Sequence, residues 1–309
     1  MYRKIMVPLD GSQLSEGILP YVRSFAEALK VPVELLHVID PEIITTFSDP
    51  DKGRYVDVVE ADMQQHGIHY LEQVARKQLP RQPSGVFTVS RTVAIGKPAE
   101  IIVDRGSAES GILIAMATHG RSGVQRWLLG SVADKVLRAA TNHLLLVRTT
   151  GGAQPPEAAP LKAVLVPLDG SMVAERVLPS VATLAKKMNL EIVLLRVCSL
   201  PVLAYEMEGY GPGFAELEGQ IREEARGYLE EKVQQLKAEG LERTSYVVLQ
   251  GDGAAEIIAL ARKTPENLIA MCTHGSSGLG RWVLGSVTDR VVRNSGDPVL
   301  VISASAKGG

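Results

Sequence analysis

The feature that most constrains the fold of this chain is an internal repeat. Residues 7–12, Val-Pro-Leu-Asp-Gly-Ser, recur unchanged at 166–171, and 15 of the 23 residues in 116–138 are identical to their partners in 271–293. The period of 155 to 159 residues is far longer than a solenoid unit and fits a whole domain. We therefore expect two copies of one domain in tandem.

The two copies are separated by residues 149–160, a segment rich in Gly, Pro and Ala. Small residues and prolines of this kind contribute little to a core and are typical of a linker. We place the first domain at 1–148 and the second at 161–309. Each is long enough to bury a hydrophobic core of its own.

Short apolar runs alternate with helical patterns in each copy. In the first copy these runs cover 5–9, 33–39, 86–93, 111–117 and 144–147. Their continuous hydrophobicity predicts strands buried on both faces, and the alternation with helices predicts a parallel sheet. The residues alone do not give the strand order. Residues 15–30 are predicted as one helix with a kink at Pro20, and Pro179 holds the same place in the second copy.

Composition excludes several classes of function. The formal net charge of −2 argues against a protein that grips nucleic acid through a basic face. No apolar run approaches the roughly 18–20 residues of a membrane span, and the first residues lack a secretory segment. Two cysteines in the chain exclude a disulfide framework and fit a reducing compartment. We expect a cytoplasmic protein with neither nucleic acid nor a membrane as partner.

The segment most informative about chemistry follows the fourth apolar run. Thr-His-Gly at 118–120 and 273–275 precedes a Gly-Ser pair, at 130–131 and 285–286, that opens a helical pattern. A glycine-containing loop can present backbone N–H groups to an anion, the serine can cap the helix, and the helix N-terminus adds partial positive charge. The pattern predicts a phosphate site at the carboxyl end of a strand. The alternative is a long loop with an ordinary N-cap.

These motifs resemble those of the ATP-binding universal stress proteins. Both copies have the Asp that closes the first strand, the Thr-His-Gly turn, and Gly-Ser-Val after nine further residues. The resemblance covers both halves and implies an α/β fold of two tandem Rossmann-like domains. Each is expected to be a five-stranded parallel sheet of order 3-2-1-4-5 with helices on both faces. The site would then lie between the first and fourth strands, where the order changes direction.

The resemblance also implies binding residues. In the first copy they are Pro8, Leu9, Asp10, Val38, Met116, Ala117, Gly120, Arg121, Gly130, Ser131 and Val132. The first three border the adenine and ribose, Val38 meets the base through its backbone, residues 116–117 form the floor, and the remainder hold phosphates. The second copy supplies Pro167, Leu168, Asp169, Val197, Met271, Cys272, Gly275, Gly285, Ser286 and Val287. For Asp10 and Asp169, a purely structural turn role is the alternative.

Both copies depart from the family pattern at its first glycine, which is Ala117 in one and Cys272 in the other. If the glycine serves only to let the ligand approach the backbone closely, one methyl group is tolerated. If the position needs a positive φ, alanine is costly there. A thiol is larger, so the second site is the more doubtful. Arg121 could pair with a phosphate, and Ser276 replaces it in the second copy.

Other candidate residues are weaker. His66 and His69 lie three residues apart on a predicted helix without a third ligand, which favours surface histidines over a metal site. Trp127 and Trp282 occupy one motif position and could either cover the phosphate loop or pack at a domain contact.

The resemblance implies a regulatory or signalling protein of the stress response that binds ATP or AMP, with Mg²⁺ left open. Hydrolysis is expected to be slow at most, because neither paired carboxylates nor a Walker lysine accompany the loop. The alternative is a tandem interaction module that binds no nucleotide. In the family the fifth strands pair, so 143–148 and 298–303 are expected to form an intramolecular pseudo-dimer, and two chains could form a homodimer.

Overall fold

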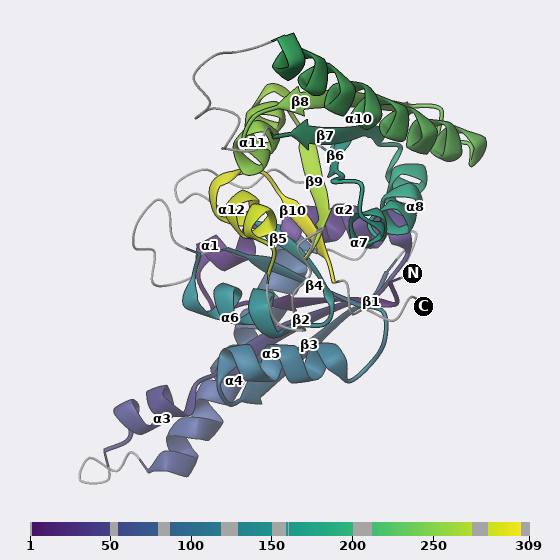
Figure 1. The fold of residues 1–309 in the computed structure, drawn as a ribbon. Helices are drawn as coiled ribbons and strands as arrows, with labels where there is room; N and C mark the ends of the chain where they lie inside the picture. The colour runs from purple at the N-terminus through teal and green to yellow at the C-terminus, as the bar shows by residue number, and fades with distance from the viewer. Residues whose placement is uncertain are drawn as a thin grey trace. The chain divides into compact units, whose positions relative to one another are not determined.

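The computed structural model describes residues 2–49, 55–79, 87–118, 129–149, 159, 161–199, 212–273 and 284–303. The described residues divide into two compact units, unit 1 within 1–159 and unit 2 within 160–304 (Figure 1). Each unit alternates strands with helices, as the apolar runs predict.

Unit 1 contains five strands and their connecting helices. In chain order these are β1 (Lys4–Pro8), α1 (Gln13–Glu16), α2 (Leu19–Leu29), β2 (Val33–Ile39), α3 (Pro41–Phe47), α4 (Val56–Gln78), β3 (Val89–Ile95), α5 (Pro98–Ser107), β4 (Ile112–Ala117), α6 (Ser131–Ala139) and β5 (His143–Val147). The strand order within the unit is β3-β2-β1-β4-β5, and all neighbours are parallel. The predicted order 3-2-1-4-5 is therefore confirmed.

Unit 2 repeats this arrangement. Its elements are β6 (Ala163–Pro167), α7 (Met172–Glu175), α8 (Leu178–Met188), β7 (Glu191–Cys198), α10 (Pro212–Ala238), β8 (Thr244–Gln250), α11 (Gly253–Lys263), β9 (Asn267–Cys272), α12 (Ser286–Asn294) and β10 (Val299–Ile302). The order within the unit is β8-β7-β6-β9-β10, again parallel throughout. The register also repeats, because Ile5 lies opposite Val33 and Val164 lies opposite Ile192.

Helices cover both faces of each sheet, which is why the central strands are apolar apart from residues at their amino ends, such as Lys4 and Asn267. Every residue of β4 and of β9 is buried. Successive side chains of a strand point to opposite faces. His37 on β2 lies against Gly67 of α4, whereas the next residue, Val38, shares a cavity with Ile102 of α5.

Two local predictions were wrong. Residues 15–30 form two helices, α1 and α2, and Pro20 lies in the first turn of α2. A proline in the first turn costs no helix hydrogen bond, so no kink results. Pro179 is placed in the same way in α8. The third strand covers Val89–Ile95, so it begins three residues later and ends two residues later than the predicted run 86–93.

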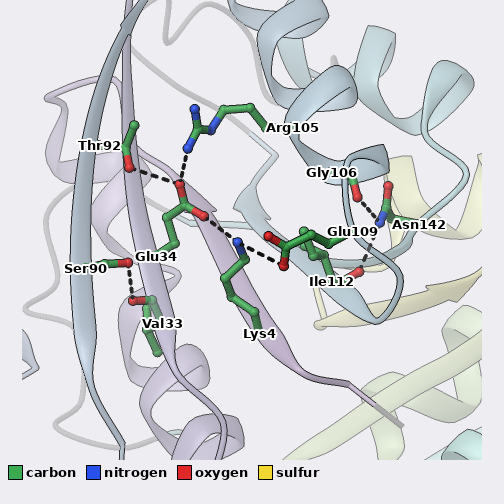
Figure 2. Close-up of polar contacts among 10 residues, drawn as sticks. All are labelled: Lys4, Val33, Glu34, Ser90, Thr92, Arg105, Gly106, Glu109, Ile112 and Asn142. Carbon is green, nitrogen blue, oxygen red and sulfur yellow. Dashed lines mark hydrogen bonds and ion pairs between the residues drawn. The ribbon is translucent and has the colours of Figure 1, made fainter. Parts of the chain in front are cut away.

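Unit 1 also buries a carboxylate at the amino ends of its strands. The side chain of Glu34 is 6% exposed, with one oxygen 2.9 Å from Lys4 Nζ. Its other oxygen accepts hydrogen bonds from Arg105 at 2.7 Å and Thr92 at 3.0 Å (Figure 2). Burial raises the pKa of Glu34, but the hydrogen bonds from Lys4, Arg105 and Thr92 together outweigh it and hold the pKa below its ordinary value. Glu34 is therefore ionised at neutral pH.

Candidate functional site

A cavity of about 260 Å³ opens in unit 1 at the carboxyl ends of β1 and β4. The strand order changes direction between these two strands, and open α/β sheets bind ligands at such a point. Nine of the residues predicted for the first site line this cavity: Pro8, Leu9, Asp10, Val38, Met116, Ala117, Gly130, Ser131 and Val132. Segments distant in sequence thus meet around one hollow.

The cavity has an apolar base and one apolar wall. Met116 and Ala117 end β4 and are 5% and 7% exposed. Six further residues line the cavity without having been predicted: Ser15, Leu36, Pro98, Ile102, Thr118 and Ala133. Pro98 marks the start of a helix in the sequence, but no sequence signal placed that helix over the carboxyl end of β2.

Asp10 lines the cavity and also stabilises the turn that follows β1. Its Oδ1 accepts hydrogen bonds from the Ser12 backbone N–H at 2.9 Å and from the Ser12 hydroxyl at 2.6 Å. Ser12 in turn caps α1 by accepting from the Ser15 N–H at 3.1 Å. The structural role foreseen as an alternative for Asp10 is therefore present. The same residue lines the cavity, so the two roles coexist.

The start of α6 forms the polar side of the cavity. Gly130 is the N-cap and offers no side chain, and Ser131 is the first helical residue. The prediction that the serine hydroxyl caps the helix was therefore wrong. Because the first N–H groups of any helix have no acceptor in a preceding turn, residues 131–133 present backbone donors and the positive end of the helix dipole at the cavity.

The corresponding residues of unit 2 are arranged differently at one point. Asp169 accepts from the Ser171 N–H at 2.9 Å and from its hydroxyl at 2.7 Å, as Asp10 does from Ser12. Gly285 is the N-cap of α12, and Ser286 is its first residue. Cys272 is 5% exposed, and its Sγ lies 3.6 Å from the Ala174 carbonyl oxygen. Ala174 corresponds to Ser15, a cavity residue in unit 1, so the thiol packs against the equivalent turn of unit 2.

The other predicted residues of the second site follow the same plan. Pro167 ends β6, and Leu168, which follows the strand, is 3% exposed. Val197 is half-buried near the end of β7, and Met271 is buried in β9. Val287 is 38% exposed and faces Gly253 at the start of α11. Burial raises the pKa of the Cys272 thiol to about 12, so this cysteine is a neutral thiol at physiological pH.

Part of each predicted loop lies outside the described residues. This applies to Gly120, Arg121 and Gly275 of the predicted sites, and to the neighbouring candidates Trp127, Trp282 and Ser276. Their predicted roles stay predictions.

A second cavity, of about 180 Å³, lies in unit 2 between α10 and the ends of β7 and β8. Its lining includes Cys198, Ile221 and Arg222. Burial raises the pKa of Cys198, although Arg196 and Arg222 act against it. Both cysteines of the chain are free thiols.

The described residues offer little for catalysis or metal binding. Asp10 is the one titratable side chain among the described residues that line the larger cavity. Nowhere in the described ranges do three or more His, Cys, Asp or Glu side chains gather as a metal site requires. His66 is exposed and bonds within its own helix, to the Asp62 carbonyl oxygen at 2.9 Å. None of the described helices combines the length and the apolar character of a membrane span.

Comparison with known proteins agrees with this architecture. The profile of the universal stress protein family matches residues 1–148 and again 160–303. A universal stress protein of Mycobacterium tuberculosis is 24% identical over 307 residues, which are 97% of this chain and 96% of that protein. One from Methanocaldococcus jannaschii is 33% identical over 147 residues, covering 47% of this chain and 84% of its own length.

Solved structures show the same fold. A universal stress protein from Archaeoglobus fulgidus superimposes with a TM-score of 0.70 at 23% identity, covering 98% of this chain and 99% of that one. The family profile matches both copies, and their parallel sheets have the order expected from the resemblance. The chain belongs to the universal stress protein family and carries two of its domains in tandem.

Proposed function

We propose that the cavity of unit 1 binds an adenine nucleotide, ATP or AMP, and that the chain acts as a regulatory protein of the stress response. The observation that carries the proposal is the start of α6, where an N-cap without a side chain leaves backbone donors facing the cavity. Phosphate groups bind well at such a helix N-terminus.

The rest of the cavity suits the remainder of a nucleotide. Leu36, Val38 and Ile102 provide an apolar wall for a flat base. Asp10 lies two residues beyond the end of β1, where its carboxylate can accept hydrogen bonds from ribose hydroxyls. Ala117 ends β4 as a small residue at the base of the hollow, and its single methyl leaves room for phosphates. Mg²⁺ would then be held chiefly by phosphate oxygens and water.

A role as an efficient ATPase has less support. Fast phosphoryl transfer requires groups that hold the metal and orient the attacking water. Asp10 is the one carboxylate among the described lining residues, and its Oδ1 is engaged by Ser12. We therefore assign the nucleotide a regulatory role, with hydrolysis slow at most.

For unit 2 the observation favours the alternative of an interaction module that binds no nucleotide. The buried Cys272 thiol extends toward Ala174, on the side from which Ser15 lines the cavity in unit 1. This thiol reduces the room for phosphates, so we propose one nucleotide per chain.

Isothermal titration of the full chain with ATP, AMP and Mg-ATP tests the proposal. The decisive variant is Gly130→Asp, because aspartate is a good N-cap and preserves α6, while its charge repels phosphate. We expect nucleotide affinity to fall by about tenfold or more. Gly130→Asn adds similar volume without charge and is expected to lose less, and Gly285→Asp makes the same change in unit 2 and is expected to have little effect. Absence of heat with every adenine nucleotide, or equal affinity for Gly130→Asp and wild type, would refute the proposal.

A further inference from the structure

Unit 1 carries a projecting element that the nucleotide proposal does not use. We call it the acidic arm and define it as residues 40–49 and 55–66, which comprise α3 and the first turns of α4. Figure 1 shows α3 and this end of α4 extending beyond the sheet of unit 1. α3 packs against α4, and the buried Ile44 is 3% exposed.

The acidic arm exposes large apolar side chains. Ile43, Phe47, Tyr55, Val56 and Val58 are 40%, 54%, 57%, 53% and 55% exposed. They are five of the nine large hydrophobic residues found exposed in the described part of the chain. Ile43 and Phe47 lie four residues apart on α3 and therefore share one side of that helix. Single exposed apolar residues are ordinary surface, but five of them on α3 and at the start of α4 mark this arm as an interaction surface.

The charges on the arm are of one sign. It carries the carboxylates of Asp40, Glu42, Asp49, Asp57, Glu60 and Asp62, and neither a lysine nor an arginine. The one basic side chain on it is His66, which lies 3.3 Å from a carboxylate oxygen of Asp62. Over the whole stretch 40–66 the sequence has seven acidic residues against Lys52 and Arg54. The arm therefore presents apolar side chains within a negative field.

Exposed apolar side chains together with negative charge indicate what kind of partner the arm can bind. Negative charge repels nucleic acid and the anionic surface of membranes. A helix with lysines or arginines beside one apolar face can bury its apolar residues on Phe47 and Val58 while its cations meet the carboxylates. We infer that the acidic arm is a docking surface for a basic amphipathic helix of another protein. The inference does not rest on the nucleotide proposal, because the arm supplies none of the residues that line the cavity.

The test uses a fluorescent synthetic peptide of leucine and lysine, with leucines at i, i+3, i+4 and i+7 so that they share one helix face. Anisotropy titration with the full chain measures its affinity. A peptide with glutamate in place of every lysine is the first control. We expect the lysine peptide to bind, the glutamate peptide not to bind, and added salt to weaken the complex.

Variants then locate the binding site. Phe47→Ser with Val58→Ser removes apolar surface, and Glu42→Gln with Asp57→Asn removes charge. Each pair is expected to weaken binding by about tenfold, since hot spots of an interface are its central apolar anchors and their charged partners. The matched control, Leu217→Ser with Glu216→Gln, changes one exposed apolar and one exposed acidic residue on α10 and is expected to leave affinity unchanged.

Two results would overturn the inference. One is a lysine peptide that fails to bind, or that binds all variants equally. The other is a wild-type chain that sediments as a dimer and is dissociated by the Phe47 and Val58 substitutions, because the surface would then be covered by a second copy. All the substituted side chains are exposed, so the variants are expected to fold, and an unchanged circular dichroism spectrum and melting temperature in the same samples check this.

Discussion

Glu34 on β2 and Val193 on β7 hold equivalent positions in the two units, because Glu34 pairs with Met6 of β1 and Val193 with Leu165 of β6. Around Glu34, unit 1 places Lys4, Thr92 and Arg105 (Figure 2). The same positions in unit 2 are Ala163, Val247 and Leu260. Unit 1 therefore places charged side chains around the buried Glu34 where unit 2 has apolar side chains.

The comparison separates what the fold requires from what one unit adds. Both sheets have the same order and register, so the fold does not require the charges. Burying ions costs desolvation energy that their attraction only offsets when each keeps its partners. In such a cluster, removing one charged side chain leaves its partners unpaired. Apolar side chains at all four positions carry no charge that needs a partner.

The largest expected effect follows from removing the cations around the buried carboxylate. Lys4→Ala with Arg105→Leu leaves Glu34, whose side chain is 6% exposed, without either cation, and we expect this double variant to lower the free energy of unfolding of unit 1 by about 3 kcal/mol. Hydrogen exchange measured by mass spectrometry on the full chain localises the loss to peptides of β1 and β2. Peptides of β6 and β7 provide an internal reference.

The control introduces the residues of unit 2 at the equivalent positions of unit 1. A quadruple variant, Lys4→Ala, Glu34→Val, Thr92→Val and Arg105→Leu, exchanges all four positions together. We expect it to recover most of the lost stability, since apolar replacement of a complete ionic cluster is often neutral. If the quadruple variant were less stable than the double variant Lys4→Ala with Arg105→Leu, the view of the cluster as mutually dependent charges would be wrong.

The second comparison concerns the floor of the proposed nucleotide site, where Ala117 of unit 1 corresponds to Cys272 of unit 2. Ala117→Cys introduces into unit 1 the thiol that in unit 2 extends toward Ala174. We expect ATP affinity to fall by about tenfold, equivalent to 1.4 kcal/mol. Calorimetric titration measures this change.

The reverse substitution sharpens the same comparison. Cys272→Ala removes the thiol from unit 2, and a second nucleotide per chain would then show that the thiol is what closes that site. Ala117→Ser serves as a control of intermediate size. Undiminished affinity in Ala117→Cys would mean that the floor of the cavity does not limit phosphate binding.

Several parts of this arrangement could be predicted from the sequence. Continuous apolar runs such as 33–39 identify buried strands, and the motif residues of the first copy gather around one cavity. The repeat identifies two domains, because identical motifs at a constant spacing require the same local structure twice.

The remaining features depend on contacts between distant segments. Lys4, Glu34 and Arg105 are separated by 30 and 71 residues, and nothing local indicates that they meet. Pro98 and Ile102 enter the cavity because α5 packs over β2, which is a tertiary property. The cap of α6 was misassigned by one residue, since both Gly and Ser are common at an N-cap.

The smallest expected effect concerns the turn in which the two units do not differ. Ser12 accepts from the Ser15 N–H at 3.1 Å and donates to Asp10 at 2.6 Å, while Ser171 accepts from the Ala174 N–H at 3.2 Å and donates to Asp169 at 2.7 Å.

Ser12→Ala and Ser171→Ala each delete an N-cap hydroxyl, so each is expected to cost about 1 kcal/mol. Hydrogen exchange of the peptides that contain α1 and α7 measures both losses in the same two units. If the two substitutions lower stability by the same amount, the turn aspartates have an equal structural role in the two units. Any difference in nucleotide binding would then arise at the ends of β4 and β9. A markedly larger cost for Ser12→Ala would instead indicate that the cavity of unit 1 depends on its turn as well as on its floor.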